Sequence, residues 1–183
     1  MKIFTGDAAD INLESFPDLY DQYVRKIFNF IYYKTHHKET AEDLTSQTFL
    51  KALKNLSQFN QKKGHFSTWL YQIARNQVID FYRSKKNDIN IEDIWDLAGN
   101  EDIPRDFDTA HRLEKVESYL KKLRPDQREI VLLRVWEGLS YKEIAKIVDK
   151  DEAQCRVVFS RTIKTIKDEM PLAVFLSLLL FFH

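Results

Sequence analysis

Apolar residues recur at helical spacing through most of this chain, and this periodicity is what most narrows the folds available to it. Phe49, Ala52, Leu53 and Leu56 fall at i, i+3, i+4 and i+7, which places them on one face of a helix. Glycine and proline, the residues that mark tight turns and hairpins, number only four each in 183 residues. The sequence therefore predicts an all-α protein.

An acidic run interrupts the helical pattern. The segment "NDINIEDIWDLAGNEDIPRDFD" contains eight acidic residues against a single arginine, together with a Gly and a Pro. This composition disfavours a packed core, so we interpret residues 87–110 as an acidic linker. The division predicts two small helical domains, residues 1–86 and 111–170, followed by an apolar tail, residues 171–183.

The segment "FSTWLYQIARNQVIDFYRSKK", which ends the first domain, combines an apolar stripe with basic residues. The stripe comprises Phe66, Leu70, Ile73, Ala74 and Val78. We expect Ser67 or Thr68 to cap this helix and the preceding "NQKKGHF" to form a loop. Residues 61–86 hold six basic residues and one acid, a local charge of +5 in a chain whose net charge is zero. Basic and aromatic residues together indicate a nucleic-acid surface.

The second domain carries helix start and stop signals at short intervals. Pro125 suits the first turn of a helix, Gly138 suits the end of one, and Ser140 with Glu143 forms a capping box. Two short helices joined by a brief turn, after two supporting helices, predict a helix-turn-helix. The outer face of its last helix carries Gln154, Arg156, Arg161, Lys164 and Lys167. These residue types reach phosphates and base edges, although a solvated four-helix cluster would look similar.

Other classes of site are disfavoured. Cys155 is the only cysteine, which excludes an internal disulfide and fits a reducing compartment. The histidines lack metal-ligand spacing, and we find no Gly-rich phosphate loop or nucleophile elbow. We therefore expect no metal, no cofactor and no enzymatic activity. The N-terminal stretch has no long apolar run, so we expect no secretory signal and a cytoplasmic protein.

Three segments resemble the compact two-domain sigma factors of bacterial RNA polymerase, often called extracytoplasmic-function (ECF) sigma factors. They are "AEDLTSQTFLKALKNLSQFN", "FSTWLYQIARNQVIDFYRSKK" and "LRPDQREIVLLRVWEGLSYKEIAKIVDKDEAQCRVVFSR". The resemblance covers about residues 16–86 and 113–168. It implies a subunit that directs core RNA polymerase to promoter DNA, where the first domain holds the unpaired −10 strand and the second reads the −35 duplex. It leaves open whether an anti-sigma factor binds the chain.

The resemblance also assigns roles to individual residues. The positions that match the polymerase-binding helix are Asp43, Leu44, Gln47 and Thr48, which we expect to form an exposed polar face with one apolar anchor. The positions that match the −10 segment are Lys62, Lys63, Phe66, Trp69, Tyr71, Arg75, Asn76, Tyr82 and Arg83. The positions that match the −35 reader are Ser140, Lys142, Gln154, Arg156, Arg161 and Lys164.

Within the −10 segment, we expect the aromatic residues to differ in their exposure. Phe66 and Trp69 lie on the apolar stripe, a position that more often belongs to a core residue than to a stacking platform. Tyr71 and Tyr82 are expected at the surface, where they would meet unpaired bases. The "NQKKGHF" loop would form the pocket for a flipped base.

The last helix departs from the family pattern. Relatives often carry a Ser-Arg pair where this chain has Val157 and Val158, so an arginine that could read guanine is missing. This departure would weaken or change −35 reading. Cys155 takes the place of a small apolar residue, and we interpret it as a core residue rather than a redox switch.

The tail "PLAVFLSLLLFFH" is apolar from Leu172 to Phe182 except for Ser177. Eleven residues of helix span about 16 Å, against about 30 Å for a hydrocarbon core, so the tail cannot cross a bilayer alone. Three interpretations stay open. It packs on the domains or on a partner, it makes a peripheral membrane contact, or the chain is a truncated form of a membrane-tethered protein.

Two alternatives to an active sigma factor stay open at this point. One is a stand-alone helix-turn-helix regulator that binds duplex DNA without polymerase, although such a regulator has no use for the N-terminal motifs. The other is an inactive or membrane-sequestered sigma paralogue, suggested by Val157, Val158 and the apolar tail.

Overall fold

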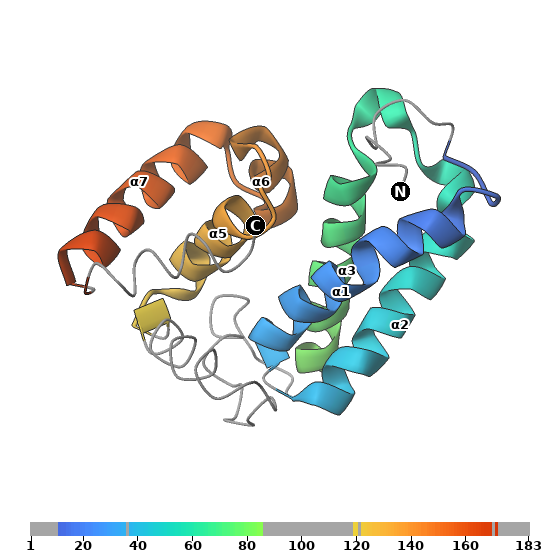
Figure 1. Cartoon of the computed structure of the whole chain (residues 1–183), viewed down its shortest axis with the longest axis horizontal. Helices are drawn as coiled ribbons and strands as arrows, with labels where there is room; N and C mark the ends of the chain where they lie inside the picture. Colours follow the sequence, from blue (N-terminus) through green and yellow to red (C-terminus); the bar gives the residue numbers. More distant parts are fainter. Residues whose placement is uncertain (1–10, 36, 86–118, 121, 170, 172–183) are drawn as a thin grey trace. The chain divides into compact units, whose positions relative to one another are not determined.

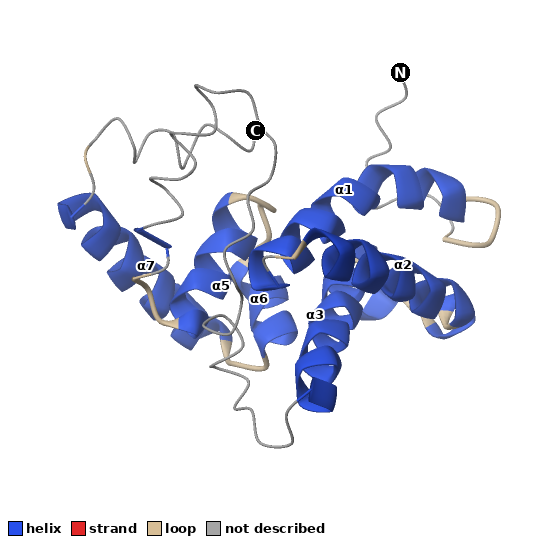
Figure 2. Cartoon of the chain, turned by 90° about the horizontal axis from the view of Figure 1, so that it is seen from below, coloured by secondary structure: helices blue, strands red, loops and turns tan. Residues whose placement is uncertain are grey.

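The computed structural model describes residues 11–35, 37–85, 119–120, 122–169 and 171. Within these ranges every regular element is an α-helix or a short 3-10 helix (Figure 2), which confirms the all-α prediction. The chain divides into two compact units, Met1–Asn100 and Glu101–His183. The acidic linker, at residues 87–110, and the tail beyond Pro171 lie outside the described residues.

Unit 1 is built, in its described part, from α1 (Phe16–Thr35), α2 (Lys38–Lys54) and α3 (Phe66–Lys85) (Figure 1). Each of these helices contacts the other two. Two short 3-10 helices, η1 (Leu56–Gln58) and η2 (Gln61–Lys63), connect α2 to α3. The "NQKKGHF" segment is therefore a connection as predicted, with one helical turn inside it.

The core of unit 1 is made by the apolar stripes of its three helices. The predicted stripe of α3, from Phe66 to Val78, is confirmed, since each of its five residues is at most 8% exposed. The expected N-cap is wrong. Helix α3 begins at Phe66, so Ser67 and Thr68 lie inside its first turn, and the backbone N–H of Trp69 donates to the His65 carbonyl. Leu53, predicted on the same helix face as Phe49, Ala52 and Leu56, is 38% exposed, whereas those three residues are buried.

Unit 2 contains α5 (Pro125–Val135), α6 (Tyr141–Val148) and α7 (Glu152–Glu169), and each contacts the others. Pro125 occupies the first turn of α5, as predicted. The capping box is present. The Ser140 hydroxyl accepts from the Glu143 backbone N–H at 3.3 Å, and the Glu143 carboxylate accepts from the Ser140 N–H at 2.8 Å. Gly138 has a φ of +67°, a left-handed value that glycine adopts without strain, in the turn before α6.

A buried arginine holds the turn that precedes α5. Arg128 is 4% exposed, and its Nε donates to the Leu120 carbonyl at 2.8 Å while its Nη2 donates to the Leu123 carbonyl at 3.1 Å. The Leu120 carbonyl also accepts from the Leu123 backbone N–H at 3.1 Å, so the guanidinium adds to a turn that is already hydrogen-bonded. The guanidinium bonds hold the preceding turn against α5, whose inner face carries the fully buried Ile130 and Leu133.

Cys155 lies in the core of unit 2, as predicted, with an exposure of 0%. Burial raises the pKa of the Cys155 thiol, and the nearby Asp151 carboxylate raises it further. Because the thiolate is the reactive form, we expect the native protein to react with a thiol reagent much more slowly than the urea-unfolded protein. Reaction with an aromatic disulfide reagent, followed by absorbance, measures this. Equal rates in the native and unfolded states would contradict the placement of Cys155.

Candidate nucleic-acid interface

Helix α2 presents two of its four predicted contact residues to solvent. Asp43 and Gln47 are exposed. Leu44 and Thr48 are 3% and 0% exposed, and the Thr48 hydroxyl donates to the Leu44 carbonyl at 2.7 Å. The expectation that all four form one exposed face is therefore wrong. Leu44 and Thr48 belong to the stripe with which α2 packs in unit 1.

Sequence reasoning missed two exposed leucines on the same helix. Leu50 is 56% exposed and Leu53 is 38% exposed. Leu53 also lines an open groove of about 620 Å³ at the end of α2, together with Leu13 and Leu56. The buried stripe of α2 includes Ala41, Leu44, Thr48 and Ala52. A prediction based on the spacing of these four residues would have placed both leucines outside the core.

A polar link joins α2 to α3 at the surface. The Gln77 side chain of α3 donates to the Gln47 amide oxygen at 3.2 Å, and Lys51 Nζ donates to the Gln77 oxygen at 3.3 Å. The exposed face of α2 is thus continuous with one edge of α3.

The aromatic side chains of α3 lie mostly inside unit 1. Tyr71 is 1% exposed, and its ring meets the Phe30 ring edge-to-face at 5.1 Å. Tyr82 is 7% exposed, and its hydroxyl donates to the Lys34 carbonyl at 3.1 Å. The expectation that both tyrosines lie at the surface is wrong. Phe66 is in the core, as expected, while Trp69 is only half-buried and lies 5.2 Å from the Phe59 ring centroid.

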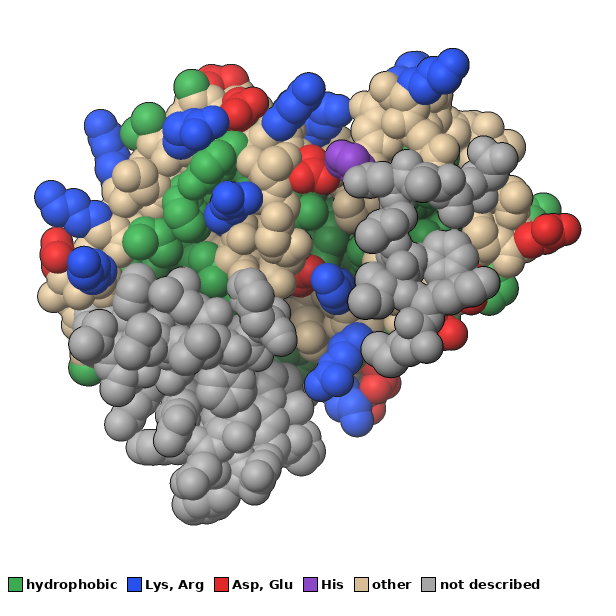
Figure 3. All heavy atoms as spheres, turned by 45° about the horizontal axis from the view of Figure 1, so that its top comes forward, with side chains coloured by type: hydrophobic (Ala, Val, Ile, Leu, Met, Phe, Trp, Pro, Cys, Tyr) green, Lys and Arg blue, Asp and Glu red, His purple; other side chains and the backbone are tan. Residues whose placement is uncertain are grey.

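The predicted −10 residues that are exposed, or half-buried at Arg75, on α3 and on the preceding η2 are polar or basic. Asn76 and Arg83 are exposed and Arg75 is half-buried. Lys62 and Lys63 are exposed on η2, whose start is fixed because the Asn60 side chain accepts from the Lys62 N–H at 2.9 Å. Figure 3 shows Lys and Arg side chains projecting from the described surface, with hydrophobic side chains visible between them.

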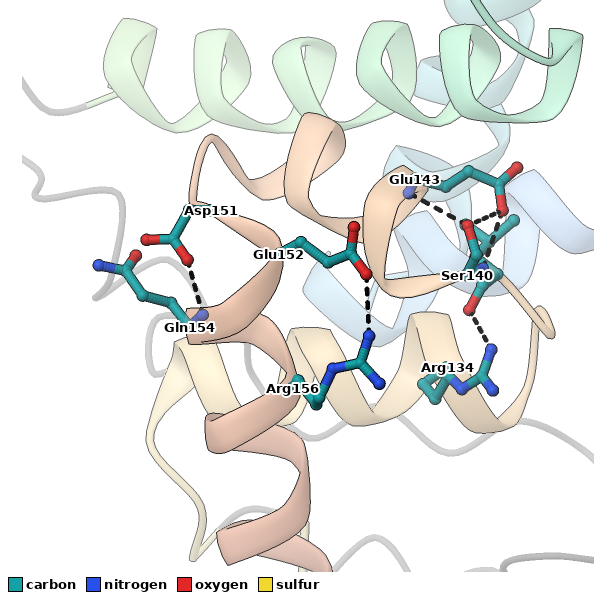
Figure 4. Close-up of polar contacts among 8 residues, drawn as sticks. Arg134, Ser140, Glu143, Asp151, Glu152, Gln154 and Arg156 are labelled. Carbon is teal, nitrogen blue, oxygen red and sulfur yellow. Dashed lines mark hydrogen bonds and ion pairs between the residues drawn. The ribbon is translucent and has the colours of Figure 1, made fainter.

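Helix α7 has a buried inner face and an exposed basic outer face. Cys155, Thr162 and Ile166 point inward, each at most 3% exposed. The exposed predicted positions of unit 2 are Ser140, Lys142, Gln154, Arg156, Arg161 and Lys164. Asp151 caps α7 by accepting from the Gln154 backbone N–H at 2.8 Å (Figure 4). Between these polar residues, Val157 is 46% exposed, whereas Val158 is half-buried.

Arg156, a predicted −35 residue, contacts side chains of both α6 and α7. Its guanidinium forms an ion pair with Glu152 at 2.9 Å and lies 4.9 Å from the centre of the Tyr141 ring. Sequence reasoning found neither partner. The i, i+4 spacing of Glu152 and Arg156 could have indicated the ion pair, but no sequence pattern connects Tyr141 to α7.

The part of the chain that the structure describes contains no cluster of three or more His, Cys, Asp or Glu side chains arranged for a metal ion. A search of the same described residues finds no helix with the length and apolar character needed to span a bilayer.

Comparison with known proteins identifies the family. The family models for sigma-70 region 2 and sigma-70 region 4 match residues 19–87 and 113–166. RNA polymerase sigma factor YlaC of Bacillus subtilis is 34% identical over 167 residues, which cover 86% of this chain and 92% of that protein. ECF RNA polymerase sigma factor SigM of the same species is 31% identical and is covered over 91% of its length. The chain belongs to the ECF family of RNA polymerase sigma factors.

Other relatives of this ECF sigma factor differ in length. ECF sigma factor BldN of Streptomyces coelicolor is 34% identical over 86% of this chain, which spans 61% of BldN. Among solved structures, the sigma factor RpoE of Bartonella quintana, determined in complex with the anti-sigma factor NepR, superposes with a TM-score of 0.70. That match covers 85% of this chain and 96% of RpoE at 21% identity, so it shows that the fold is shared.

Burial raises the pKa of Tyr82 in this sigma factor from 10.0 to about 12. The folded state therefore keeps the phenol protonated at pH values where the unfolded state ionises, so this contribution to stability is present below pH 10 and is lost between pH 10 and about 12. We expect Tyr82→Phe to lower the free energy of unfolding by about 1 kcal/mol near neutral pH, because it removes the bond to the Lys34 carbonyl. The difference between the two proteins should shrink as the pH rises from 10 to 12.

Urea unfolding of both proteins at several pH values measures this difference. Tyr20→Phe, which removes a hydroxyl from a tyrosine that is 43% exposed, is the matched control. A difference between wild type and Tyr82→Phe that stays constant or grows with pH would contradict the buried, protonated phenol.

Proposed function

We propose that this chain is the subunit that directs core RNA polymerase to promoters with defined −10 and −35 elements and enables initiation there. The observation that carries the proposal is that the two sigma regions occur in order in one chain, each on its own helical unit. A regulator that binds duplex DNA alone needs only the second unit. Bond formation then belongs to the polymerase, and this chain acts in the cytoplasm without a catalytic site of its own.

Core polymerase would bind the outer face of α2. Asp43 and Gln47 offer a charge and an amide, and the exposed Leu50 and Leu53 offer apolar area beside them. Apolar anchors ringed by polar groups are typical of helix-mediated protein interfaces. Leu44 and Thr48 would support this face from within the core rather than touch the polymerase.

The unpaired −10 strand would lie along the exposed face of α3 and η2. Lys62, Lys63 and Arg83 would neutralise phosphates, and Asn76 with the half-buried Arg75 would donate to bases or the backbone. Trp69 is the aromatic ring of this segment best placed to stack on a base, a contact worth about 1–3 kcal/mol. Phe66, Tyr71 and Tyr82 would shape the helix from inside.

The −35 duplex would meet the outer face of α7. Gln154, Arg156 and Arg161 would reach base edges and phosphates, with Lys142 and Lys164 as further phosphate contacts. The Ser140 hydroxyl is engaged by Glu143, so its contribution would be to hold the start of α6. Exposed Val157 offers methyl groups where relatives often have serine, which favours contact with a thymine methyl group.

We also propose that an anti-sigma protein regulates this chain. The fold is shared with RpoE in its complex with the anti-sigma factor NepR and with CnrH in its complex with the cytosolic domain of CnrY. The exposed leucines of α2 are the surface that would attract such a partner.

Reconstitution with core RNA polymerase tests the proposed function. We expect the chain to co-elute with core and to start transcription at discrete genomic sites. Asp43→Lys should weaken binding to core by about tenfold, since it reverses the charge of an exposed residue on the proposed contact face. Glu42→Lys is the matched control, because Glu42 is the neighbouring exposed acid, 3.9 Å from Lys38.

Two results would contradict this assignment. An equal loss of affinity for core polymerase in the two variants would mean that binding does not depend specifically on Asp43. A chain that binds duplex DNA but not core polymerase would favour a stand-alone regulator.

A further inference from the structure

Side chains from α5 and α7 meet at Tyr141, the first residue of α6. The guanidinium carbon of Arg134, in the last turn of α5, lies 4.9 Å from the centre of the Tyr141 ring. The guanidinium carbon of Arg156, on α7, lies at the same distance from it. The ring of Phe159, one turn further along α7, meets the Tyr141 ring edge-to-face at 5.7 Å.

Each arginine is also fixed at a second point. Arg134 Nη1 donates to the Leu139 carbonyl at 2.7 Å, in the turn that leads into α6, and Arg156 Nη2 donates to the Glu152 carboxylate at 2.9 Å (Figure 4). Arg134 therefore ties the ring to the scaffold. Two cations beside one ring repel each other, and the Glu152 carboxylate offsets this repulsion at Arg156.

These contacts restrict the conformation of the Arg156 side chain and still leave it able to bind DNA. The Tyr141 ring contacts the Arg156 guanidinium through its aromatic face. The Glu152 carboxylate accepts a hydrogen bond from one of the five N–H groups of Arg156. The remaining N–H groups can donate to two acceptors at once, and guanine presents such a pair, O6 and N7, in the major groove. An exposed arginine without these contacts would lose more rotamer freedom on binding DNA.

We infer that Tyr141 is a positioning residue for promoter reading, which holds Arg156 in the conformation that recognises a guanine of the −35 element. This inference rests on the proposed function. Tyr141 acts through Arg156, Arg134 anchors the ring, and Glu152 sets the direction of the guanidinium. Lys164, further along the exposed face of α7, is placed to act on phosphates without this network.

The test uses holoenzyme made from core RNA polymerase and the full chain, on a promoter mapped by its transcription start. Binding is measured for promoter fragments in which each −35 base pair is replaced in turn. The Arg156→Ala variant first identifies the base pair that Arg156 reads, because replacing that base pair no longer changes the affinity of this variant. We expect Tyr141→Leu to reduce discrimination at that same base pair by about two- to fivefold, the loss that corresponds to an exposed cation–π contact.

Matched variants separate positioning from a merely structural role. Tyr141→Phe keeps the ring and should keep wild-type discrimination. Adding Tyr141→Leu to Arg156→Ala should cause no further loss at that base pair, because the residue acts through Arg156. Lys164→Ala should lower the affinity for all fragments alike. Urea unfolding of each variant confirms that the compared proteins are folded.

Five results would overturn the inference, and the last of them would overturn the proposed function as well. Tyr141→Leu could discriminate as wild type does, or weaken all fragments equally. Tyr141→Phe could lose as much as Tyr141→Leu, which would assign the role to the hydroxyl. Arg156→Ala could leave every base preference unchanged. A wild-type chain that does not initiate with core polymerase would overturn the proposed function itself and this inference with it.

Discussion

The burial of one stripe of α3 determines what unit 1 can offer to a partner. Leu70 and Ala74 are completely buried, and the helix cannot rotate without exposing them to water. Because the stripe also takes in Tyr71 and Tyr82, the face left outside carries Asn76 and Arg83 instead of tyrosine rings. Helix α3 thus places aromatic rings on its buried face, which keep the helix in place, and Asn76 and Arg83 on its exposed face.

In unit 2, capped helix ends determine which side chains are exposed to a partner. Asp151 fixes the start of α7, and Ser140 with Glu143 fixes the start of α6, so the short connection between these helices holds α7 in one orientation. The buried Cys155 and Thr162 then decide which side chains of α7 face outward. A helix held in this way presents Gln154 and Arg156 reproducibly, as recognition of a duplex requires.

The sequence predicted helical periodicity well, and side-chain exposure less well. The all-α class, the stripe from Phe66 to Val78 and the capping box at Ser140 follow from local patterns that tertiary packing did not override. Tyr71 and Tyr82, predicted at the surface, are buried because they lie at helical spacing on the same face of α3 as Ala74 and Val78. A phenol can be buried when its hydroxyl finds a partner, as Tyr82 does at the Lys34 carbonyl.

Other features lay beyond sequence patterns for a physical reason. The spacing of Leu53 places it on the same helix face as Phe49 and Ala52, but only the packing of α1 and α3 decides how much of that face is covered. The contact between Tyr141 and Arg156 joins residues on different helices, so no local spacing encodes it. The exposed Asp43 and the buried Leu44 are adjacent in the sequence. A family pattern alone does not show which of two adjacent residues is exposed.

In the proposed function, unit 1 holds an unpaired −10 strand while unit 2 of the same chain reads the −35 duplex. Permanganate footprinting of a mapped promoter, with core polymerase and this chain together, tests it most directly, because permanganate oxidises unpaired thymines. We expect reactive thymines at the −10 element only when both core and chain are present. Protection of a duplex site by the chain alone, with no reactive thymines when core is added, would contradict it.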